Sequence, residues 1–243
     1  MPGGAYLALS GVKTRVAQLD RIAADLANAT TAGYKGERTS TVSAPRDGDL
    51  FGRALDAAID VTDGPVKVDF RPGPLTATGR DLDVAVDGDG FFEIETPNGP
   101  RYTRNGHFTR SPEGMLATID GSPVAGEGGP IELPPNETVI FDTDGTVHVG
   151  AKIVGQIKLV DFADKSRLTR EGGSMFVAPD DLEPTPLDEP VLRGGALEGS
   201  NVSVVESMVR LVEVSRTFDT LQKGIGTVMN DLDQRAITEY GRK

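Results

Sequence analysis

The stretch LDRIAADLANATTAGYK, residues 19–35, joins two different kinds of sequence. Its first half continues an apolar pattern with steps of four and three residues, and its second half is small, polar and contains glycine. Because a/d heptad spacing places one face of a helix against another helix, the pattern predicts an N-terminal packing helix. Its members are Ala5, Leu9, Val12, Val16, Leu19, Ala23 and Leu26.

Two residues are candidates for the end of this helix. Asn28 follows the last member of the pattern, and Gly33 suits the left-handed conformation that terminates many helices. If Gly33 has a positive φ, its replacement by alanine should cost about 1 kcal/mol. Tyr34 and Lys35 would then start the connection to the next part of the chain.

A second heptad-like pattern lies near the C-terminus and predicts another long helix. Turn residues, among them Ser200 and Asn201, precede it, and Ser203-Val-Val-Glu206 fits a capping box. Gly224 and Gly226 indicate either a bend or the close approach of a neighbour. The apolar members are Val204, Met208, Leu211, Val214, Phe218, Leu221, Ile225, Val228 and Leu232.

Between these helices the pattern changes to short apolar or alternating runs separated by Gly, Pro, Asn and Asp, which is typical of antiparallel strands. The runs lie at 66–70, 82–86, 91–95, 115–119, 138–141, 146–149 and 153–162. The segment RYTRNGHFTR, residues 101–110, predicts a hairpin with a type I′ turn at Asn105-Gly106. That turn would pair Thr103 with Phe108.

These patterns together predict an α+β protein. The N- and C-terminal α-helices are expected to pack as a coiled-coil-like layer, with a central antiparallel β-rich domain. The expected parts are an N-terminal packing helix and junction at 1–35, an arm at 36–64, the β domain at 65–176, a returning linker at 177–199 and a C-terminal packing helix at 200–243.

The charge of the chain is concentrated in its middle. The net charge is −12, and residues 41–199 hold 14 basic and 28 acidic side chains, whereas both ends are nearly neutral. This balance argues against a nucleic-acid partner. The lack of cysteine excludes disulfides and thiolate chemistry. No apolar run reaches the length of a membrane span, and the N-terminal residues do not fit a cleaved signal peptide.

Candidate catalytic groups are few. The chain has two histidines, His107 and His148, and no nucleophile-elbow motif accompanies them. The segment DLDVAVDGDG, residues 81–90, lacks EF-hand spacing, and RPGPLTATGR, residues 71–80, lacks P-loop spacing. We therefore expect no catalytic residue, no metal site and no cofactor. A soluble β-domain enzyme or ligand-binding protein with a helical dimerisation stalk is the alternative from another functional class.

Four segments resemble, in the same order, the motifs of bacterial flagellar rod and hook proteins: residues 19–35, 75–95, 101–110 and 195–218. The chain departs from the N-terminal motif at Ala24-Asp25 and at Thr30, where the family commonly has asparagine. The residues that match the family motifs are Asn28, Thr31, Gly33, Tyr34, Lys35, Asp83, Gly88, Gly90, Phe91, Phe92, Tyr102, Arg104, Gly106, Phe108, Ser200 and Asn201.

The resemblance implies a structural subunit of the flagellar basal-body rod that transmits torque, most like the proximal rod members, with the distal rod as the near alternative. It implies assembly with copies of itself and with other rod proteins in the periplasm. It also implies passage through the flagellar type III export apparatus without cleavage. In that setting the apolar residues of both helical patterns, from Ala5 to Leu26 and from Val204 to Leu232, would pack against each other and against neighbouring subunits.

Overall fold

The computed structural model describes residues 3–41, 63–135, 137–187 and 189–240, with side chains described in these ranges except at 3–11, 39–41, 63–65, 225 and 227–240. The chain divides into two compact units. The helical unit comprises residues 1–27, 37–67 and 203–243, and the β unit comprises residues 28–36 and 68–202. The chain therefore passes from one unit to the other at four points along its length.

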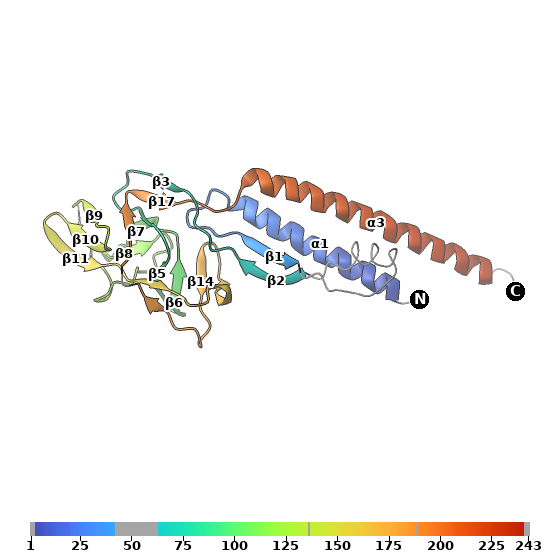
Figure 1. Ribbon diagram of the computed structural model, residues 1–243, viewed down its shortest axis with the longest axis horizontal. Helices are drawn as coiled ribbons and strands as arrows, with labels where there is room; N and C mark the ends of the chain where they lie inside the picture. The colour runs from blue at the N-terminus through green and yellow to red at the C-terminus, as the bar shows by residue number, and fades with distance from the viewer. Residues whose placement is uncertain (1–2, 42–62, 136, 188, 241–243) are drawn as a thin grey trace. The chain divides into compact units, whose positions relative to one another are not determined.

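The helical unit contains two long helices, α1 (Gly3–Ala27) and α3 (Val204–Tyr240), which contact each other (Figure 1). It also contains β1 (Glu37–Thr41), which pairs with β2 (Asp63–Val68). Half-buried residues at alternating steps of three and four define one seam on each helix. On α1 these are Val12, Arg15, Leu19, Ile22 and Leu26, and on α3 they are the buried Ser207 with Leu211, Val214, Phe218 and Leu221.

The predicted fold class is wrong in its helical part. The described residues contain two α-helices and otherwise mainly antiparallel β-structure, with no coiled-coil layer at the N-terminus. The predicted patterns mixed two faces of each helix: Val16, Ala23, Val204 and Met208 are exposed. Arg15 and Ser207 hold the corresponding seam positions, and such polar residues do not supply a continuous apolar seam.

The helix ends follow local chemistry. The α1 helix ends at Ala27, and Asn28 begins a turn in which its carbonyl oxygen accepts a hydrogen bond from the Thr31 amide at 3.0 Å. At the start of α3, Ser203 Oγ accepts a hydrogen bond from the Glu206 amide at 3.4 Å, as the capping box predicts. In the described part of the chain, no helix has both the length and the apolar character to cross a membrane.

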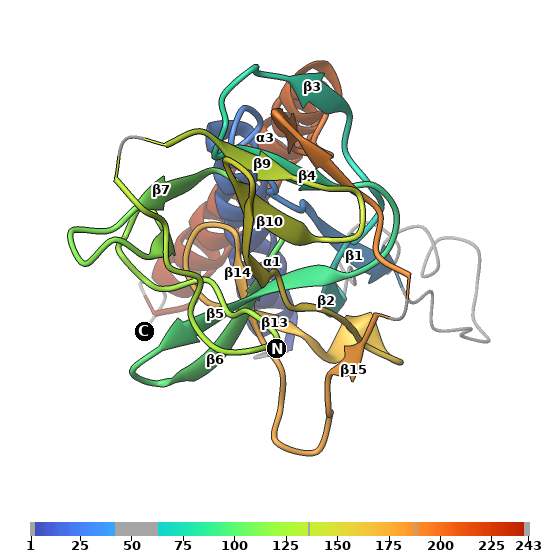
Figure 2. The ribbon, with the colours of Figure 1, turned by 90° about the vertical axis from the view of Figure 1, so that its left-hand side faces the viewer.

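Short strands build the β unit (Figure 2). They are β3 (Leu75–Ala77), β4 (Val84–Val86), β5 (Phe91–Thr96), β6 (Gly99–Thr103), β7 (Phe108–Arg110), β8 (Leu116–Thr118), β9 (Val139–Phe141), β10 (Thr146–Val149), β11 (Lys152–Gln156), β12 (Leu159–Asp161), β13 (Thr169–Arg170), β14 (Met175–Val177), β15 (Thr185–Pro186), β16 (Leu192–Gly194) and β17 (Ala196–Glu198). One 3-10 turn, η1 (Lys165–Arg167), precedes β13.

A six-stranded sheet with the order β13-β14-β6-β5-β12-β15 organises this unit. Neighbouring strands in it are antiparallel. Because side chains alternate along a strand, consecutive residues of β5 enter different cores. Phe92 belongs to the larger core, with β9, β10 and β16, whereas Phe91 belongs to the smaller core, with Tyr102 and Phe176. Two strand pairs, β16-β4 and β17-β3, connect residues 192–198 with residues 75–86 earlier in the chain.

The hairpin predicted at Asn105-Gly106 is wrong. Strand β6 pairs with β5 on one side and β14 on the other, so β7 pairs with β8. The hairpin that forms instead uses the two-residue loop at 97–98, between β5 and β6. Gly106 serves close packing: a Cβ there would overlap the carbonyl of Val84, whose carbon would lie 2.7 Å away.

Candidate functional site

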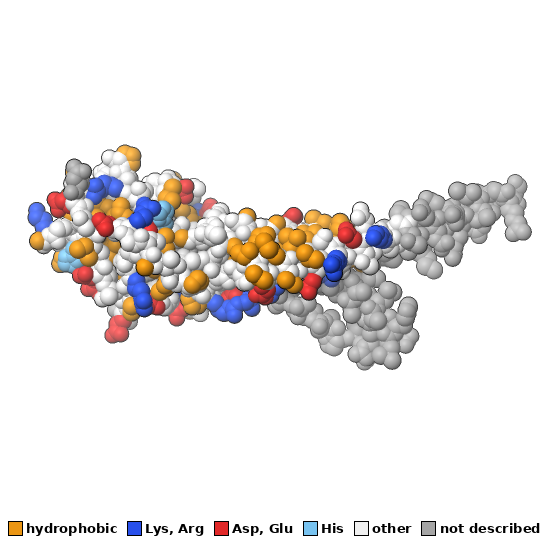
Figure 3. Space-filling model, turned by 90° about the horizontal axis from the view of Figure 1, so that it is seen from above, with side chains coloured by type: hydrophobic (Ala, Val, Ile, Leu, Met, Phe, Trp, Pro, Cys, Tyr) orange, Lys and Arg blue, Asp and Glu red, His pale blue; other side chains and the backbone are white. Residues whose placement is uncertain are grey.

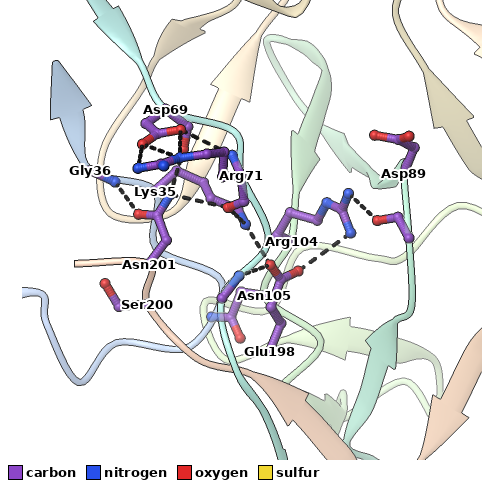
Figure 4. A network of polar contacts seen from close by, with 12 residues as sticks. Lys35, Gly36, Asp69, Arg71, Asp89, Arg104, Asn105, Glu198, Ser200 and Asn201 are labelled. Carbon is purple, nitrogen blue, oxygen red and sulfur yellow. Dashed lines mark hydrogen bonds and ion pairs between the residues drawn. The ribbon is translucent and has the colours of Figure 1, made fainter. Parts of the chain in front are cut away.

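Three charged side chains with almost no exposure meet inside the β unit (Figure 4). Lys35 comes from the incoming segment 28–36, Arg104 follows β6, and Glu198 ends β17. Their side chains are 0%, 4% and 1% exposed. Long charged side chains are seldom buried to this degree unless they are paired, so these three define the candidate site.

The carboxylate of Glu198 is the centre of this network. One oxygen, Oε1, accepts hydrogen bonds from Lys35 Nζ at 2.5 Å and from the Gly73 amide at 2.9 Å. The other, Oε2, lies 3.4 Å from Arg104 Nη1. Lys35 Nζ also donates to the Arg71 carbonyl at 2.9 Å, and Arg104 Nη2 donates to the Gly88 carbonyl at 2.6 Å. The network thereby connects segments that are far apart in the sequence.

The backbone of the incoming segment is fixed beside this network. The Gly33 amide donates to the Glu198 carbonyl at 2.7 Å. Gly33 has φ of +67°, which confirms the predicted left-handed conformation. A Cβ at this position would also overlap the backbone of Arg104 and Asn105, whose Cα would lie 2.6 Å away. The expected cost of about 1 kcal/mol for Gly33→Ala covers only the φ strain, and we expect this overlap to add to it.

Asn201 fixes the outgoing segment, residues 199–202 after β17, to the incoming segment. Its Oδ1 accepts a hydrogen bond from the Gly36 amide at 2.8 Å, and its Nδ2 donates to the carbonyls of Asp69 at 2.6 Å and Arg71 at 3.1 Å. Its own amide donates to the Tyr34 carbonyl at 3.3 Å. One amide side chain therefore bridges the incoming segment, the chain after β2 and the outgoing segment.

Arg170 closes the network from strand β13. Its guanidinium carbon lies 4.3 Å from the centre of the Tyr34 ring and 5.5 Å from that of Phe176. The same side chain donates hydrogen bonds to the Lys35 carbonyl and, at 3.0 Å, to the Gly173 carbonyl. A cation held over an aromatic face adds to the stability of the ring's position.

Burial shapes the electrostatics of the site. Loss of solvation lowers the pKa of Lys35, and the attraction of Glu198 opposes that effect. Burial likewise lowers the pKa of Arg104, against the attraction of Glu198, Asp89 and Asp161. Two cations share one buried carboxylate, and the amine of Lys35 is enclosed. This arrangement suits a structural lock better than proton transfer to a substrate.

Asp83, another family-motif residue, forms a second polar cluster. Its Oδ1 is 2.6 Å from His107 Nδ1, and its Oδ2 accepts a hydrogen bond from Thr78 at 2.7 Å. The second ring nitrogen of His107 lies 3.2 Å from Arg80 Nη1. Because this nitrogen faces a guanidinium, the pair lacks the nucleophile contact that a catalytic dyad requires. The other histidine, His148, pairs with Asp142 at 2.8 Å.

The remaining motif residues lie in the turns and cores around the network. Gly88 and Gly90 have φ of +117° and +110° before β5. Phe91, Phe92, Tyr102 and Phe108 are buried. Thr31 Oγ1 donates to Asn28 Oδ1 at 3.2 Å, and Ser200 Oγ accepts from the Val202 amide at 3.2 Å. Among the described residues, no group of three His, Asp or Glu side chains is arranged to hold a metal ion.

The residues predicted to pack between subunits fall into three groups according to the burial of their side chains. Val12, Leu19, Leu26, Leu211, Val214, Phe218 and Leu221 are half-buried. Val16, Ala23, Val204 and Met208 are exposed. The side chains of Ala5, Leu9, Ile225, Val228 and Leu232 lie outside the described residues. Gly224 and Gly226 lie within α3, and open space surrounds a Cβ built on either residue.

Sequence reasoning did not single out Glu198 or Arg170. A signal for Glu198 exists, because it is a lone carboxylate between the apolar pair Ala196-Leu197 and the turn that begins at Gly199. A charge in such a setting often marks a buried partner. Its partner could not be identified in that way, because Lys35 is 163 residues away in the sequence.

The helical unit has a groove of its own, bordered by α1, β1 and α3. Its charged lining residues are Arg21, Asp25, Glu37, Arg38, Arg210 and Glu213. Equal numbers of cations and anions give this groove no preference for a ligand of either sign.

Comparison with known proteins gives two family matches and several similar full-length proteins. Residues 85–149 match the family described as flagellar hook protein FlgE/F/G D1 domain, and residues 193–239 match the flagellar basal body rod FlgEFG protein C-terminal family. The chain is 34% identical, over 251 residues, to the flagellar basal-body rod protein FlgF of Caulobacter vibrioides, with 100% of this chain and 99% of that protein covered. The chain belongs to the family of flagellar basal-body rod proteins.

Two further members of the rod-protein family show how wide the similarity is. FlgF of Salmonella typhimurium is 34% identical, with 92% of each chain covered. FlgG of Bacillus subtilis is 30% identical, with 91% of this chain and 93% of that protein covered. Membership of the rod-protein family confirms the prediction of a structural protein and contradicts the enzyme alternative. The second family match includes Glu198 and Asn201, and the first includes Arg104.

Proposed function

We propose that this chain is a structural subunit of the flagellar basal-body rod, where it assembles with copies of itself and with other rod proteins and passes torque along the rod. Its relatives are named as basal-body rod proteins, which supports this role. The single observation that carries it is the 34% identity to the rod protein FlgF of Caulobacter vibrioides over 100% of this chain.

The network suits a mechanical role because it holds the β unit to both of its connecting segments. A force on segment 28–36 reaches β17 through the Lys35–Glu198 pair and the hydrogen bond from the Gly33 amide. A force on the outgoing segment reaches the same place through Asn201. Burial of these contacts keeps them from exchanging with water, so both segments stay fixed to the body of the β unit.

Deletion of the gene tests this function. The deletion strain should be non-motile, and its purified basal bodies should lack a complete rod. Complementation with the wild-type gene or with Glu171→Ala should restore swimming, because Glu171 is half-exposed in an ion pair with Arg101. Complementation with Glu198→Ala should fail or restore only weak swimming. Normal motility and complete rods in the deletion strain would contradict the proposed function.

We infer a proximal position in the rod, on the basis of the opening sequence AYLALSG and the similarity to FlgF proteins at 34% identity. Basal bodies from a strain that lacks the distal rod protein should then still contain this chain. Its loss from those basal bodies would favour a distal position. We also propose passage through the flagellar export apparatus without cleavage, which requires the protein in purified basal bodies to keep the sequence that begins PGGAYLALSG.

A further inference from the structure

Two asparagines of the chain are followed by glycine, in Asn98-Gly99 and in Asn105-Gly106. Asparagine is among the thermally labile residues, because the backbone nitrogen of the next residue can attack its side-chain amide. Glycine at the next position leaves that nitrogen open to approach, since it carries no side chain. The two dipeptides are identical, so the structure around them decides which one reacts.

Asn105 is held in place by its surroundings. Its Oδ1 accepts a hydrogen bond from the His107 amide at 3.0 Å. Its backbone lies against Gly33, and Gly106 lies against the carbonyl of Val84, with no room for a Cβ at either glycine. Attack by the Gly106 nitrogen requires the Asn105 backbone to turn, so these contacts must first open.

Asn98 lies in the exposed two-residue loop between β5 and β6. Thr96 and Gly99 form the last pair of the β5–β6 ladder before this loop. Pro100 follows and has no amide hydrogen, so β6 is weakly held at this end. A Cβ on Gly99 would find its nearest atom, Nη1 of Arg101, at 3.8 Å. This end of the ladder therefore opens at a small cost in free energy, as the ends of strands commonly do.

The guanidinium of Arg101 contacts the peptide unit that would react. Its Nη1 donates hydrogen bonds to the carbonyls of Asn98 and Pro100, both at 3.1 Å. The Asn98 carbonyl and the Gly99 nitrogen share one resonant peptide unit, so loss of the Gly99 proton places negative charge partly on this oxygen. A hydrogen bond from a cation stabilises that charge. The geometry therefore makes the Gly99 nitrogen a better nucleophile.

We propose that Asn98 is a site of spontaneous deamidation promoted by Arg101, and that the fold protects Asn105 from the same reaction. The Gly99 nitrogen loses its proton to water or hydroxide and bonds to Cγ of Asn98. The bond from Cγ to the side-chain nitrogen then breaks, and that nitrogen takes up a proton and leaves as ammonia. Water opens the resulting succinimide at either carbonyl, which leaves aspartate or isoaspartate at position 98.

The consequence lies in the backbone more than in the charge. Acidic and basic side chains are mixed over the face of the β unit drawn in Figure 3, so one more carboxylate changes such a surface little. Isoaspartate, in contrast, adds a methylene carbon to the main chain between residues 98 and 99. The longer loop disturbs the pairing of Thr96 with Gly99. Because the reaction needs no enzyme, the modified fraction rises with the age of each copy.

Incubation of the purified protein in mildly alkaline buffer tests this proposal. Trypsin cuts after Arg104 and so places the two asparagines on different peptides, whose mass and chromatographic position report deamidation. We expect Asn98 in the folded protein to react at least about tenfold faster than Asn105, which reacts only after local opening. In urea the two sites should react at similar rates, because the contacts that hold Asn105 are lost.

A pair of variants tests the role of Arg101. Arg101→Gln should slow the conversion of Asn98 at least roughly threefold, because the cation on the reacting peptide unit is removed. Arg193→Gln is the matched control and should leave the rate unchanged, since Arg193 is a 61% exposed cation paired with Asp87. Both proteins should keep wild-type circular dichroism.

Three results would overturn the inference. Equal conversion of Asn98 and Asn105 in the folded protein would show that the fold does not protect Asn105. Conversion of Asn98 in urea but not in the folded protein would show that the hairpin protects Asn98 as well. An unchanged rate in Arg101→Gln would remove Arg101 from the mechanism. The rod function is tested separately by the deletion strain, so none of these results bears on it.

Discussion

The β unit and the helical unit differ in how far one chain completes them. In the β unit even Lys35 and Glu198 are buried and paired, and the two cores are closed. In the helical unit the side chains of Val205 and Val209 are exposed at 73% and 54%. Family-motif sequence runs through both units. Under the proposed rod function, the β unit would provide the stable body and the helices would provide surfaces for assembly.

The largest effect is expected at the centre of the β-unit network. Glu198→Ala leaves Lys35 and Arg104 buried without their shared carboxylate, and it should lower the free energy of unfolding by about 3–5 kcal/mol. Urea unfolding followed by circular dichroism measures this loss. Glu171→Ala is the control and should change the free energy by less than about 1 kcal/mol, because its ion pair is half-exposed. Similar losses in both variants would show that the network does not stabilise the β unit in the way we describe.

Gly33→Ala should produce the next largest loss. A positive φ costs about 1 kcal/mol for alanine, and overlap with the backbone of Asn105 adds about 1–3 kcal/mol. Gly79→Ala separates the two contributions, because Gly79 has φ of +70° and open space around a Cβ. In thermal unfolding, the Gly79 variant should therefore lose about 1 kcal/mol of the free energy of unfolding, and the Gly33 variant should lose clearly more. Equal losses would remove the close approach at Gly33 from the explanation.

Substitutions on the two faces of α3 should change the free energy of unfolding of the isolated protein by different amounts. Leu211→Ala, in the seam, should lower the free energy of unfolding by roughly 1–2 kcal/mol, because the residue is half-buried. Val209→Ala, at a position of α3 that is 54% exposed, should stay within about 0.5 kcal/mol of the wild type. Chemical unfolding of both proteins as monomers makes the measurement. A larger loss of stability from Val209→Ala than from Leu211→Ala would show that Val209, and not Leu211, packs inside the protein.

The smallest effect is expected from exposed carboxylates of the β unit at low pH. Ion pairs with Lys165 and Arg167 lower the pKa of Asp89 and Asp181 below the ordinary value of 3.8. Because the folded pKa is the lower one, this stabilisation is complete above 3.8 and is lost as the pH falls through the folded pKa. Unfolding measured from about pH 5 to pH 2 should show a weak dependence that Asp89→Asn reduces. High salt should reduce it as well.

The sequence predicted the helical periodicity but not which residues face inward. Steps of three and four were correct for both helices, but the predicted set took Val16 and Val204 for seam residues. Each helix has apolar residues on two faces, and periodicity alone does not say which face meets the other helix. The polar residues Arg15 and Ser207, which occupy seam positions, could not be distinguished from surface residues by their spacing.

Local turn chemistry was predictive only where no strand competed. The positive φ of Gly33 follows from its place after a helix and is confirmed. The Asn105-Gly106 turn failed because β5 and β14 occupy both edges of β6. Strand partners depend on contacts between distant residues, and these are absent from a pattern of ten residues.

By itself, the sequence determined that two long helices flank a domain of short strands and that the motifs of a rod protein lie in order along the chain. Those features depend on local spacing and local backbone preference. Only the tertiary structure decided that Lys35, Arg104 and Glu198 share one buried site, and that Val205 and Val209 of α3 are exposed. Both outcomes depend on which distant surfaces meet. Burial is a property of the packed chain, because the same apolar or charged residue gains or loses free energy according to its neighbours.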